Sequence, residues 1–372
     1  MTNFFPTYLA MGQTFCNRTA ELKHLKRNLE SGVPTLLISP RRYGKTSLAL
    51  KVLYQENYLF THVDLYKAFS EEDVIRYILN GVGQLLGKIE AAPKKLLLLA
   101  GELFSKIHIR VAYHQAKLSL EFGKEKTLSI ELLLQALEKL DALGVKRKQR
   151  LIFFLDEFQM VGEVTPNHAL EAALREIVQK AKSLVFIFCG SNRHLMEQIF
   201  SDKKRPFYKL CDQIQLERIR AEAYIPYVQQ AAQETWKSPL PADVLETVFR
   251  LTERHPYYVN KLCSILSRYD TLPTAQTVED TWLQYTQENK SMTERELSLL
   301  PLSQRRLLML LAQQKEVSGP FHRDFISDSR MSLGAIQAAL KNLLRLDYLL
   351  KKPDNSYLII DPLIKSTLCL DL

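Results

Sequence analysis

Short apolar segments alternate with helical patterns along the first half of the chain. Four of these segments, at 35–38, 59–64, 151–155 and 184–189, have the length of strands and are followed by polar residues. Their mainly apolar character is typical of strands that are buried on both faces of a sheet. Because a helical pattern precedes each segment, we expect a parallel sheet with right-handed crossovers.

One stretch, 105–125, interrupts this alternation. Within it, segments 107–112 and 117–122 each alternate apolar and polar positions, and His114 and Gln115 lie between them. Alternation with a period of two predicts strands that have one buried face. We therefore expect a β-hairpin inserted into the α/β pattern.

The pattern becomes helical from residue 217 onward. Segments 221–235, 242–252 and 256–267 have apolar residues at helical spacing. They predict a small all-helical region at 217–292.

The C-terminal region at 293–372 combines helices with a short hairpin. Three helical segments are followed by two short strands around a Pro-Asp-Asn turn. This order predicts a winged helix-turn-helix. The five segments are 303–312, 321–326, 332–346, 348–351 and 357–360.

Composition and charge narrow the class of protein. The chain has 372 residues, of which 46% are hydrophobic and 24% charged, so we expect a globular protein with two or three domains. The formal net charge of +9 favours an anionic partner, such as a nucleotide, a nucleic acid or an acidic surface. A mildly basic balance is equally compatible with a protein that contacts no nucleic acid.

Cysteine usage and the apolar runs bear on the cellular compartment. Five widely spaced cysteines, with no Cys-x-x-Cys pair, argue against a disulfide framework or a structural zinc site. No signal sequence is apparent at the N-terminus, and every apolar run is far shorter than the roughly 20 residues that span a bilayer. We therefore expect a soluble cytoplasmic protein without a membrane partner.

The turn after the first predicted strand has the residues of a phosphate-binding loop. It matches the pattern G-x-x-x-x-G-K-[ST], except that Ser39 replaces the first glycine. In such a loop, backbone N–H groups and the start of the next helix bind phosphate, while Lys45 contacts the β- and γ-phosphates and Thr46 binds Mg²⁺. The residues predicted to contact the nucleotide are Ser39, Pro40, Arg41, Arg42, Tyr43, Gly44, Lys45, Thr46 and Ser47.

Two acids, Asp156 and Glu157, follow the third predicted strand. Ligands of open α/β sheets bind at the carboxyl ends of the strands, so both acids should lie beside the phosphates. We expect Asp156 to hold Mg²⁺ and Glu157 to act as the general base that polarises the attacking water. Adjacent acids after a strand can also simply begin a helix, and it is the pairing with the phosphate loop that favours catalysis.

The fourth predicted strand ends in Gly190, Ser191 and Asn192. A polar side chain at this edge could hold the water or the γ-phosphate, so Ser191 and Asn192 are candidate catalytic residues. A helix cap is the alternative role for either residue.

Together these residues resemble the archaeal-ATPase-like branch of the AAA+/STAND P-loop NTPases. The similarity runs from residue 15 to residue 267. It includes the motif that precedes the phosphate loop, the phosphate loop itself and the strand that ends in Asp156. It also includes the end of the next strand and the start of the last helix at 256–267. Ser39 and His255 depart from this family pattern, because each stands where glycine is usual. The matching segments are 15–22, 40–48, 155–159, 190–191 and 255–258.

The resemblance implies a three-layer α/β fold with a parallel-sheet P-loop core of the ASCE type at 1–216, an all-helical lid at 217–292 and a winged helix at 293–372. It also implies ATP and Mg²⁺ as ligands, with the adenine held between the N-terminal segment and the lid. By this likeness Arg18 lies near the base, and Pro256 packs on the nucleotide side of the lid.

Segment 201–209 is similar to a stretch from which relatives often supply a cation to a neighbouring subunit. Arg205, Lys209 and Lys204 are the candidates for such a cation, which would stabilise the charge on a neighbour's γ-phosphate. A solvated basic loop is the alternative.

The predicted recognition helix, 332–346, and the hairpin after it carry polar residues that could contact DNA. Because the helix is otherwise mainly Leu and Ala, packing on the core or on a protein partner is the alternative. The polar residues are Gln337, Lys341, Asn342, Arg345, Lys351 and Lys352.

These patterns lead us to expect an ATP-binding and ATP-hydrolysing protein that acts as a nucleotide-driven switch or motor. One alternative is a slow signalling or scaffold protein that bound ATP holds in one state. A second alternative is a nucleotide-dependent DNA-binding protein. We also expect a protein partner or further copies of the chain, and we disfavour a P-loop kinase because no basic phosphate-acceptor lid is visible.

Overall fold

The computed structural model describes residues 4–90, 95, 101, 109–114, 117–122, 128–165, 167–313, 323–352 and 354–370. The chain divides into two units, which we call the core unit and the C-terminal unit. The core unit holds Arg18–Arg41 and Lys45–Leu216. The C-terminal unit holds Met1–Asn17, Arg42–Gly44 and Glu217–Leu372.

A five-stranded parallel sheet forms the centre of the core unit, in the order β2-β5-β6-β1-β7. The four strands expected from the apolar segments are present, and the prediction of a parallel sheet is confirmed. The edge strand β7 was not predicted. The strands are β1 (Thr35–Ile38), β2 (Leu59–Asp64), β5 (Leu151–Asp156), β6 (Leu184–Gly190) and β7 (Asp212–Gln215).

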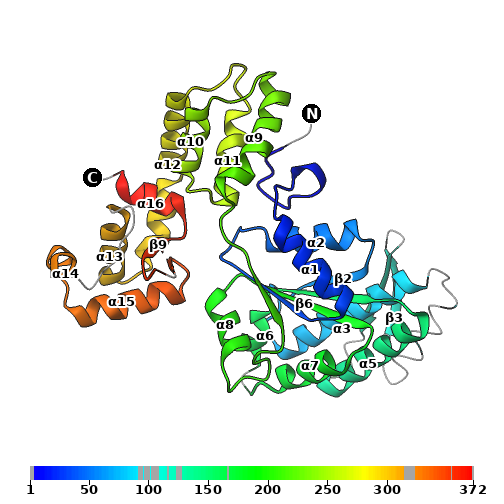
Figure 1. The fold of residues 1–372 in the computed structure, drawn as a ribbon. Helices are drawn as coiled ribbons and strands as arrows, with labels where there is room; N and C mark the ends of the chain where they lie inside the picture. Colours follow the sequence, from blue (N-terminus) through cyan, green and yellow to red (C-terminus); the bar gives the residue numbers. More distant parts are fainter. Residues whose placement is uncertain are drawn as a thin grey trace. The chain divides into compact units, whose positions relative to one another are not determined.

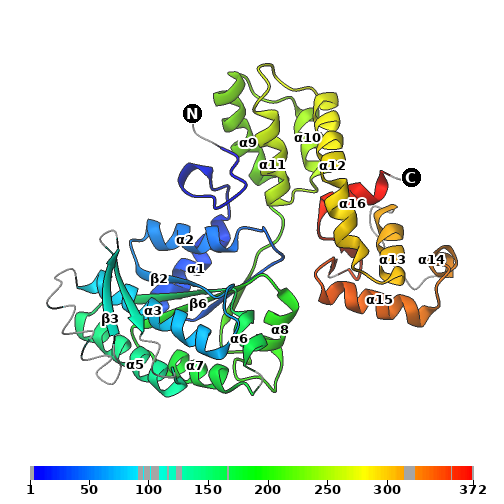
Figure 2. The same ribbon diagram turned by 180° about the vertical axis from the view of Figure 1, so that it is seen from behind.

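Helices cover both faces of this sheet, as Figures 1 and 2 show. Alternate residues of β5, such as Phe153 and Leu155, belong to one apolar cluster with α3, α5 and α7, so these helices cover one face. Helices α1 and α2 cover the other face. The helices are α1 (Thr19–Ser31), α2 (Lys45–Gln55), α3 (Glu71–Ile89), α5 (Ile130–Arg147), α6 (Gln159–Val164), α7 (Ala169–Lys180) and α8 (Arg193–Ser201).

The predicted hairpin is present in the core unit. Strand β3 (Ile109–His114) pairs antiparallel with β4 (Lys117–Phe122). Residues 107 and 108 of the first predicted strand and the turn residue Gln115 lie outside the described residues.

Four helices and the N-terminal segment form the first part of the C-terminal unit. Phe4 and Phe5 pack in the apolar cluster of these helices, together with Tyr224 and Trp282. The fourth helix, α12, was not predicted. The helices are α9 (Ala221–Trp236), α10 (Ala242–Leu251), α11 (Pro256–Leu266) and α12 (Ala275–Ser298).

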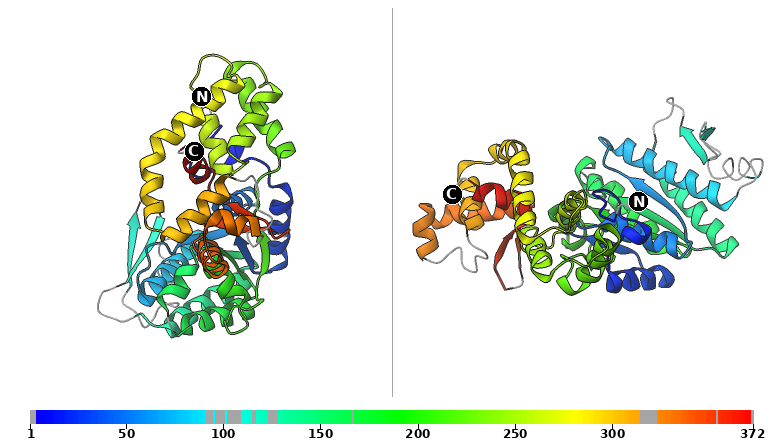
Figure 3. Two further views of the ribbon diagram at one scale, coloured as in Figure 1. Left: turned by 90° about the vertical axis from the view of Figure 1, so that its left-hand side faces the viewer. Right: turned by 90° about the horizontal axis from the view of Figure 1, so that it is seen from above.

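The second part of the C-terminal unit has the expected helices and hairpin around its own apolar cluster. It also has a closing helix, α16 (Pro362–Cys369), that was not predicted. Figure 3 shows the long helix α12 reaching from the first group of helices to the second. The other elements are α13 (Leu302–Gln313), α14 (Arg323–Ser329), α15 (Leu333–Arg345), β8 (Leu349–Lys351) and β9 (Tyr357–Ile359).

The boundary between the units at Leu216 and Glu217 is visible in the structure, whereas the expected boundary at 292 falls inside α12. The division into 1–216, 217–292 and 293–372 therefore stays a prediction. None of the helices in the described ranges is long and apolar enough to cross a membrane.

Candidate active site

The phosphate loop joins β1 to α2, and Lys45 is the first residue of that helix. The Lys45 Nζ atom donates hydrogen bonds to the carbonyl oxygens of Ser39 (2.9 Å) and Pro40 (3.0 Å) and to Ser39 Oγ (3.3 Å). The ammonium group therefore lies inside the loop, at the start of a helix, where an anion is bound favourably. This donor set fits a nucleotide phosphate.

The backbone explains why a serine is tolerated at the first glycine position. Positive φ angles in the loop occur at Arg42 (63°) and Gly44 (90°), and Ser39 is not among the residues with a positive φ. Only the left-handed region favours glycine, so the Ser39 side chain brings no strain of that kind. Ser39 is almost fully buried.

Thr46 and Asp156 lie side by side at the carboxyl edge of the sheet. Thr46 Oγ1 donates a hydrogen bond of 2.7 Å to Asp156 Oδ2. Mg²⁺ in nucleotide sites takes a few oxygen ligands from the protein and the rest from phosphates and water. A hydroxyl and a carboxylate beside the loop lysine fit that requirement.

Asp156 is held in its ionised form by its neighbours. Burial raises the pKa of Asp156, but hydrogen bonds from His62 and Thr46 outweigh burial and hold this pKa below its usual value. His62 Nε2 lies 3.3 Å from Asp156 Oδ2, and its ring stacks on Phe154 with centroids 4.5 Å apart. His62 was not a predicted site residue, and the signal that the sequence offered was a histidine in a mainly apolar predicted strand.

Glu157 follows β5 with a left-handed backbone, at a φ of 53°. Its Oε2 atom accepts hydrogen bonds from Ser191 Oγ (2.7 Å), from the Ser191 backbone N–H (3.2 Å) and from Gln159 Nε2 (2.5 Å). Ser191 Oγ in turn accepts a hydrogen bond of 3.3 Å from Arg41 Nε. The structure thus brings Glu157, Ser191 and Arg41 together, and Gln159 joins them without having been predicted to.

Asn192 has a different contact from Ser191. Its side chain caps α8 by accepting a hydrogen bond of 3.1 Å from the backbone N–H of Leu195. Of the two catalytic candidates after β6, Ser191 is the one whose side chain contacts Glu157. A catalytic role for Asn192 stays a prediction of the sequence.

The side chains at the tip of the phosphate loop contact other residues of the C-terminal unit. The Arg42 guanidinium lies 4.2 Å from the centroid of the Tyr257 ring. Tyr43 is buried, and its ring meets His255 edge-on at 4.9 Å. Because these side chains are used for packing, the predicted phosphate contacts of Arg42 and Tyr43 would come from their backbone N–H groups.

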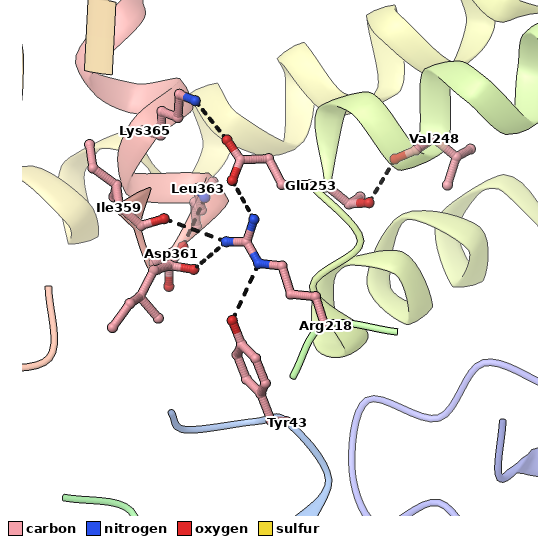
Figure 4. Close-up of polar contacts among 10 residues, drawn as sticks. Tyr43, Arg218, Val248, Glu253, Ile359, Asp361, Leu363 and Lys365 are labelled. Carbon is pink, nitrogen blue, oxygen red and sulfur yellow. Dashed lines mark hydrogen bonds and ion pairs between the residues drawn. The ribbon is translucent and has the colours of Figure 1, made fainter. Parts of the chain in front are cut away.

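Arg218 joins the loop tip to the end of the chain, as Figure 4 shows. Its guanidinium donates hydrogen bonds to the Tyr43 hydroxyl (3.3 Å), to Glu253 Oε2 (2.5 Å) and to the carbonyl of Ile360 (3.0 Å). Lys365 Nζ lies 2.7 Å from the other Glu253 oxygen. Nothing in the sequence pattern indicated this network.

The remaining predicted site residues are Arg18, Pro256 and Ser47. Arg18 directly precedes α1, is buried and forms a 3.0 Å ion pair with Glu21, whereas Pro256 opens α11 in the C-terminal unit. Ser47 is buried in the first turn of α2. The nucleotide contacts of these three residues stay predictions.

Arg205, one of the three candidate trans-acting cations, is engaged within its own chain. Its Nε donates a hydrogen bond of 3.0 Å to Glu171 Oε2, and its Nη2 contacts the other oxygen of this fully buried carboxylate. A buried carboxylate needs such a partner, and removing Arg205 would leave Glu171 with the His168 imidazole, whose Nδ1 lies 3.3 Å from Oε1. Lys204 and Lys209 are exposed and remain the better candidates.

The parallel sheet, with Lys45, Thr46 and Asp156 meeting at one edge, defines a P-loop NTPase fold. Residues 15–262 match the family model described as an ATPase domain predominantly from Archaea, and the chain belongs to this family. Residues 293–369 match the family model described as "Probable winged helix domain". The expected family and the C-terminal winged helix are thereby confirmed.

Solved structures share this fold over nearly the whole chain. A Walker-type ATPase of Pyrococcus abyssi is 17% identical, with a TM-score of 0.70 over 99% of this chain and 100% of that chain. The Aeropyrum pernix ORC2 protein, solved as ADPNP–ADP complexes, is 13% identical, with a TM-score of 0.57 over 99% of this chain and 98% of that chain. No curated protein sequence matches this chain significantly.

Proposed function

We propose that this protein binds ATP with Mg²⁺ and hydrolyses it, and that it acts as a nucleotide-driven switch or motor. The observation that carries the proposal is the 2.7 Å contact of Thr46 Oγ1 with Asp156 Oδ2, made by residues that directly follow Lys45 and directly precede Glu157 in the sequence. These groups come from the start of α2 and from the end of β5 with the residue after it, and they are the groups that phosphoryl transfer to water requires.

Each side chain has a definite role in this proposal. Lys45 binds the β- and γ-phosphates, and Thr46 and Asp156 hold the Mg²⁺ ion, which when bound neutralises phosphate charge. Glu157 accepts a proton as the water oxygen bonds to the γ-phosphorus. The bond from that phosphorus to the bridging oxygen of ADP breaks, which yields ADP and inorganic phosphate.

Phosphate release by the whole protein tests the proposal. We expect Glu157→Gln to lower kcat by about 10²-fold or more while ATP still binds, because the amide cannot accept the proton. We expect Lys45→Ala to weaken ATP binding itself. Glu163→Gln, the same chemical change at an exposed position of α6, is the control and should leave kcat unchanged.

Equal, near-zero rates for the wild-type protein and Glu157→Gln would contradict hydrolysis. Tight ATP binding together with such rates would instead support the alternative of a slow signalling or scaffold protein held in one state by ATP. The same assays therefore distinguish the two functions.

A second candidate function is DNA binding by the winged helix. Gln337, Lys341 and Arg345 are exposed on α15, and Lys351 is exposed on the following hairpin, so one helix and its wing present cations. Such a helix and wing can contact base edges and phosphates. Asn342 and Lys352 are half-buried, which makes them weaker candidates.

The exposed Lys204 and Lys209 also support assembly with further copies of the chain or with a protein partner. Light scattering with and without ATP tests whether a neighbouring subunit is present to receive a cation. The five free cysteines in the described residues are consistent with a reducing compartment, and we place the protein in the cytoplasm.

A further inference from the structure

The two oxygens of the Glu157 carboxylate have different surroundings. Oε2 accepts all three hydrogen bonds, from Gln159 and from the hydroxyl and backbone of Ser191. In the part of the chain that the structure describes, no group donates a hydrogen bond to Oε1. One oxygen is therefore anchored, and the other is left to accept a hydrogen bond from water.

The burial of the Gln159 amide is energetically unfavourable, and its contact with Glu157 explains why a glutamine is nevertheless buried here. Its side chain is 4% exposed, and its Oε1 atom is buried without a hydrogen-bond partner among the described residues. Burying an unpaired amide oxygen is unfavourable, and an apolar side chain of similar size would avoid the loss. The opposite orientation of the amide would put its oxygen against the Glu157 carboxylate, so the carboxylate determines which way the amide points.

The end of β6 leaves room for this amide. A Cβ atom at Gly190 would lie 2.4 Å from Gln159 Oε1 and 2.5 Å from the Met196 sulfur. A side chain at this position would push against the ends of the Gln159 and Met196 side chains, so Gly190 gives the Gln159 amide its space beside Glu157. The turn is also tied to β6, because the Phe158 backbone N–H donates a hydrogen bond of 2.9 Å to the Cys189 carbonyl.

The two residues that donate to Glu157 Oε2 come from different elements, and together they fix the orientation of the carboxylate. Gln159 is the first residue of α6, whereas Ser191 follows β6. A carboxylate held from one side alone can still rotate, whereas donors from two fixed elements define both its place and its orientation. Arg41 adds a link to the phosphate loop, because it donates to the same Ser191 hydroxyl that donates to Glu157.

We propose that Gln159 is a positioning residue for hydrolysis: with Ser191 it anchors Oε2 of Glu157, and thereby aims Oε1 at the attacking water. This inference rests on the proposed ATPase function. Gln159 does not touch the reacting atoms and acts only through Glu157.

The first test replaces Gln159 by leucine, which keeps the volume and removes the donor. We expect Gln159→Leu to lower kcat about tenfold to a hundredfold, because a misplaced catalytic group loses that much rate. KM for ATP and the affinity for a non-hydrolysable ATP analogue should stay within about twofold of wild type, since neither depends on Glu157 orientation. Gln304→Leu is the matched control, because Gln304 is a buried glutamine of α13 that also has an unpaired Oε1.

A double-mutant cycle separates positioning from general structural damage. In a Glu157→Gln background, measured by single turnover with excess enzyme, adding Gln159→Leu should cause no further loss of rate. A loss by the same factor in both backgrounds would overturn the proposal, and so would wild-type kcat in Gln159→Leu. If Gln159→Leu unfolds at a lower temperature, Gln159→Met, which is longer and more adaptable, must give the same cycle.

Failure of the inference and failure of the proposed function give different results. Equal rates for wild type and Glu157→Gln would remove the hydrolysis that Gln159 is proposed to serve, and would overturn both. A fast wild type, a slow Glu157→Gln and an unimpaired Gln159→Leu would overturn only the role of Gln159.

Discussion

The imidazole of His255 is buried between aromatic rings and beside cations. It is 3% exposed, its ring meets Tyr43 and Tyr258 edge-on, and its Nδ1 has no hydrogen-bond partner among the described residues. Burial, together with the charges of Arg218 and Arg42, lowers the pKa of His255 to about 3. The folded C-terminal unit therefore holds this side chain in its neutral form.

This burial predicts a loss of stability in mild acid. The pKa of His255 in the unfolded chain is about 6.5, above the folded value, so the unfolded state takes up a proton first as the pH falls. The contribution of neutral His255 to the free energy of unfolding is fully present above about pH 6.5. It is lost as the pH falls towards 3, by about 1.4 kcal/mol per pH unit. Thermal unfolding of wild type and His255→Phe at pH 7.5 and 5.5 measures the effect.

We expect the phenylalanine variant to lose less stability between these two pH values than wild type. His194→Phe, at a half-buried position of α8, is the control for removing an imidazole. The same pH dependence in wild type and His255→Phe would show that His255 does not cause it.

At the residue scale, the sequence predicted contacts that depend on neighbouring positions in the chain. Lys45 and Thr46 are adjacent, and a loop between a strand and a helix fixes their placement, so their pattern predicted their location. Gln159 and Arg218 could not be assigned in this way. Their contacts depend on a left-handed turn at Glu157 and on residues that lie far apart in the sequence.

Helix α3 lies very close to the sheet at Gly81. A Cβ atom at this position would lie 2.6 Å from Val63 Cγ2 and 2.7 Å from Phe153 Cζ, and both are side chains of buried strands. Glycine weakens a helix interior by about 1 kcal/mol relative to alanine. The close packing of α3 on β2 and β5 therefore explains a residue that helix propensity alone disfavours.

A pair of glycine replacements tests this explanation. Gly81→Ala should destabilise the protein by about 1 to 2 kcal/mol, because overpacking in a buried core exceeds the gain in helix propensity. Gly334→Ala in α15 should be neutral or stabilising by up to about 1 kcal/mol, since no atom lies within 4 Å of its added Cβ. Urea unfolding measures both, and stabilisation by both alanines would contradict the close approach of α3.

The elements that the sequence predicted are those with a strong apolar pattern. Strands β1 and β6 are buried at every position, so their apolar runs were clear. Strand β7 has only one buried residue, Ile214, because it lies at the sheet edge, and its other residues are polar. Helix α16 is short and closely follows a predicted strand. Its few apolar residues therefore did not show a helical spacing that could be distinguished from the strand pattern.

At the scale of the whole molecule, the exposed cations of α15 and of the following hairpin offer one place for the anionic partner that the net charge of +9 favours. If the winged helix binds DNA, each cation that contacts a phosphate contributes about 0.9 to the slope of log K against log salt. Neutralising Lys341, Arg345, Lys351 and Lys352 together should lower this slope by up to about 4, and binding measured by fluorescence anisotropy across a salt series gives the value.

Four exposed cations of the core unit provide the control for that experiment: Lys23, Arg27, Lys146 and Lys148. Their neutralisation should leave most of the slope unchanged. An equal loss for both sets would show that net charge, rather than the winged helix, determines binding.

The two units do not follow the order of the sequence. Met1–Asn17 and Arg42–Gly44 group with Glu217–Leu372 and not with the residues that neighbour them in the sequence. Contacts such as those of Phe4 and Phe5 with the apolar cluster of α9 to α12 join positions far apart in the chain, and no local pattern predicts them.

This arrangement has a consequence for folding during synthesis. Domains generally fold as units while the chain emerges from the ribosome, so the sheet, whose residues end at Leu216, can pack first. Phe4 and Phe5 can reach their final packing only later, when the helices that they contact have been synthesised. Tyr43 precedes its partners Arg218 and His255 by more than 170 residues, and acquires them only after the core residues up to Leu216 have been made. The tip of the phosphate loop is thus synthesised before most of the core but is among the last segments to reach its final packing.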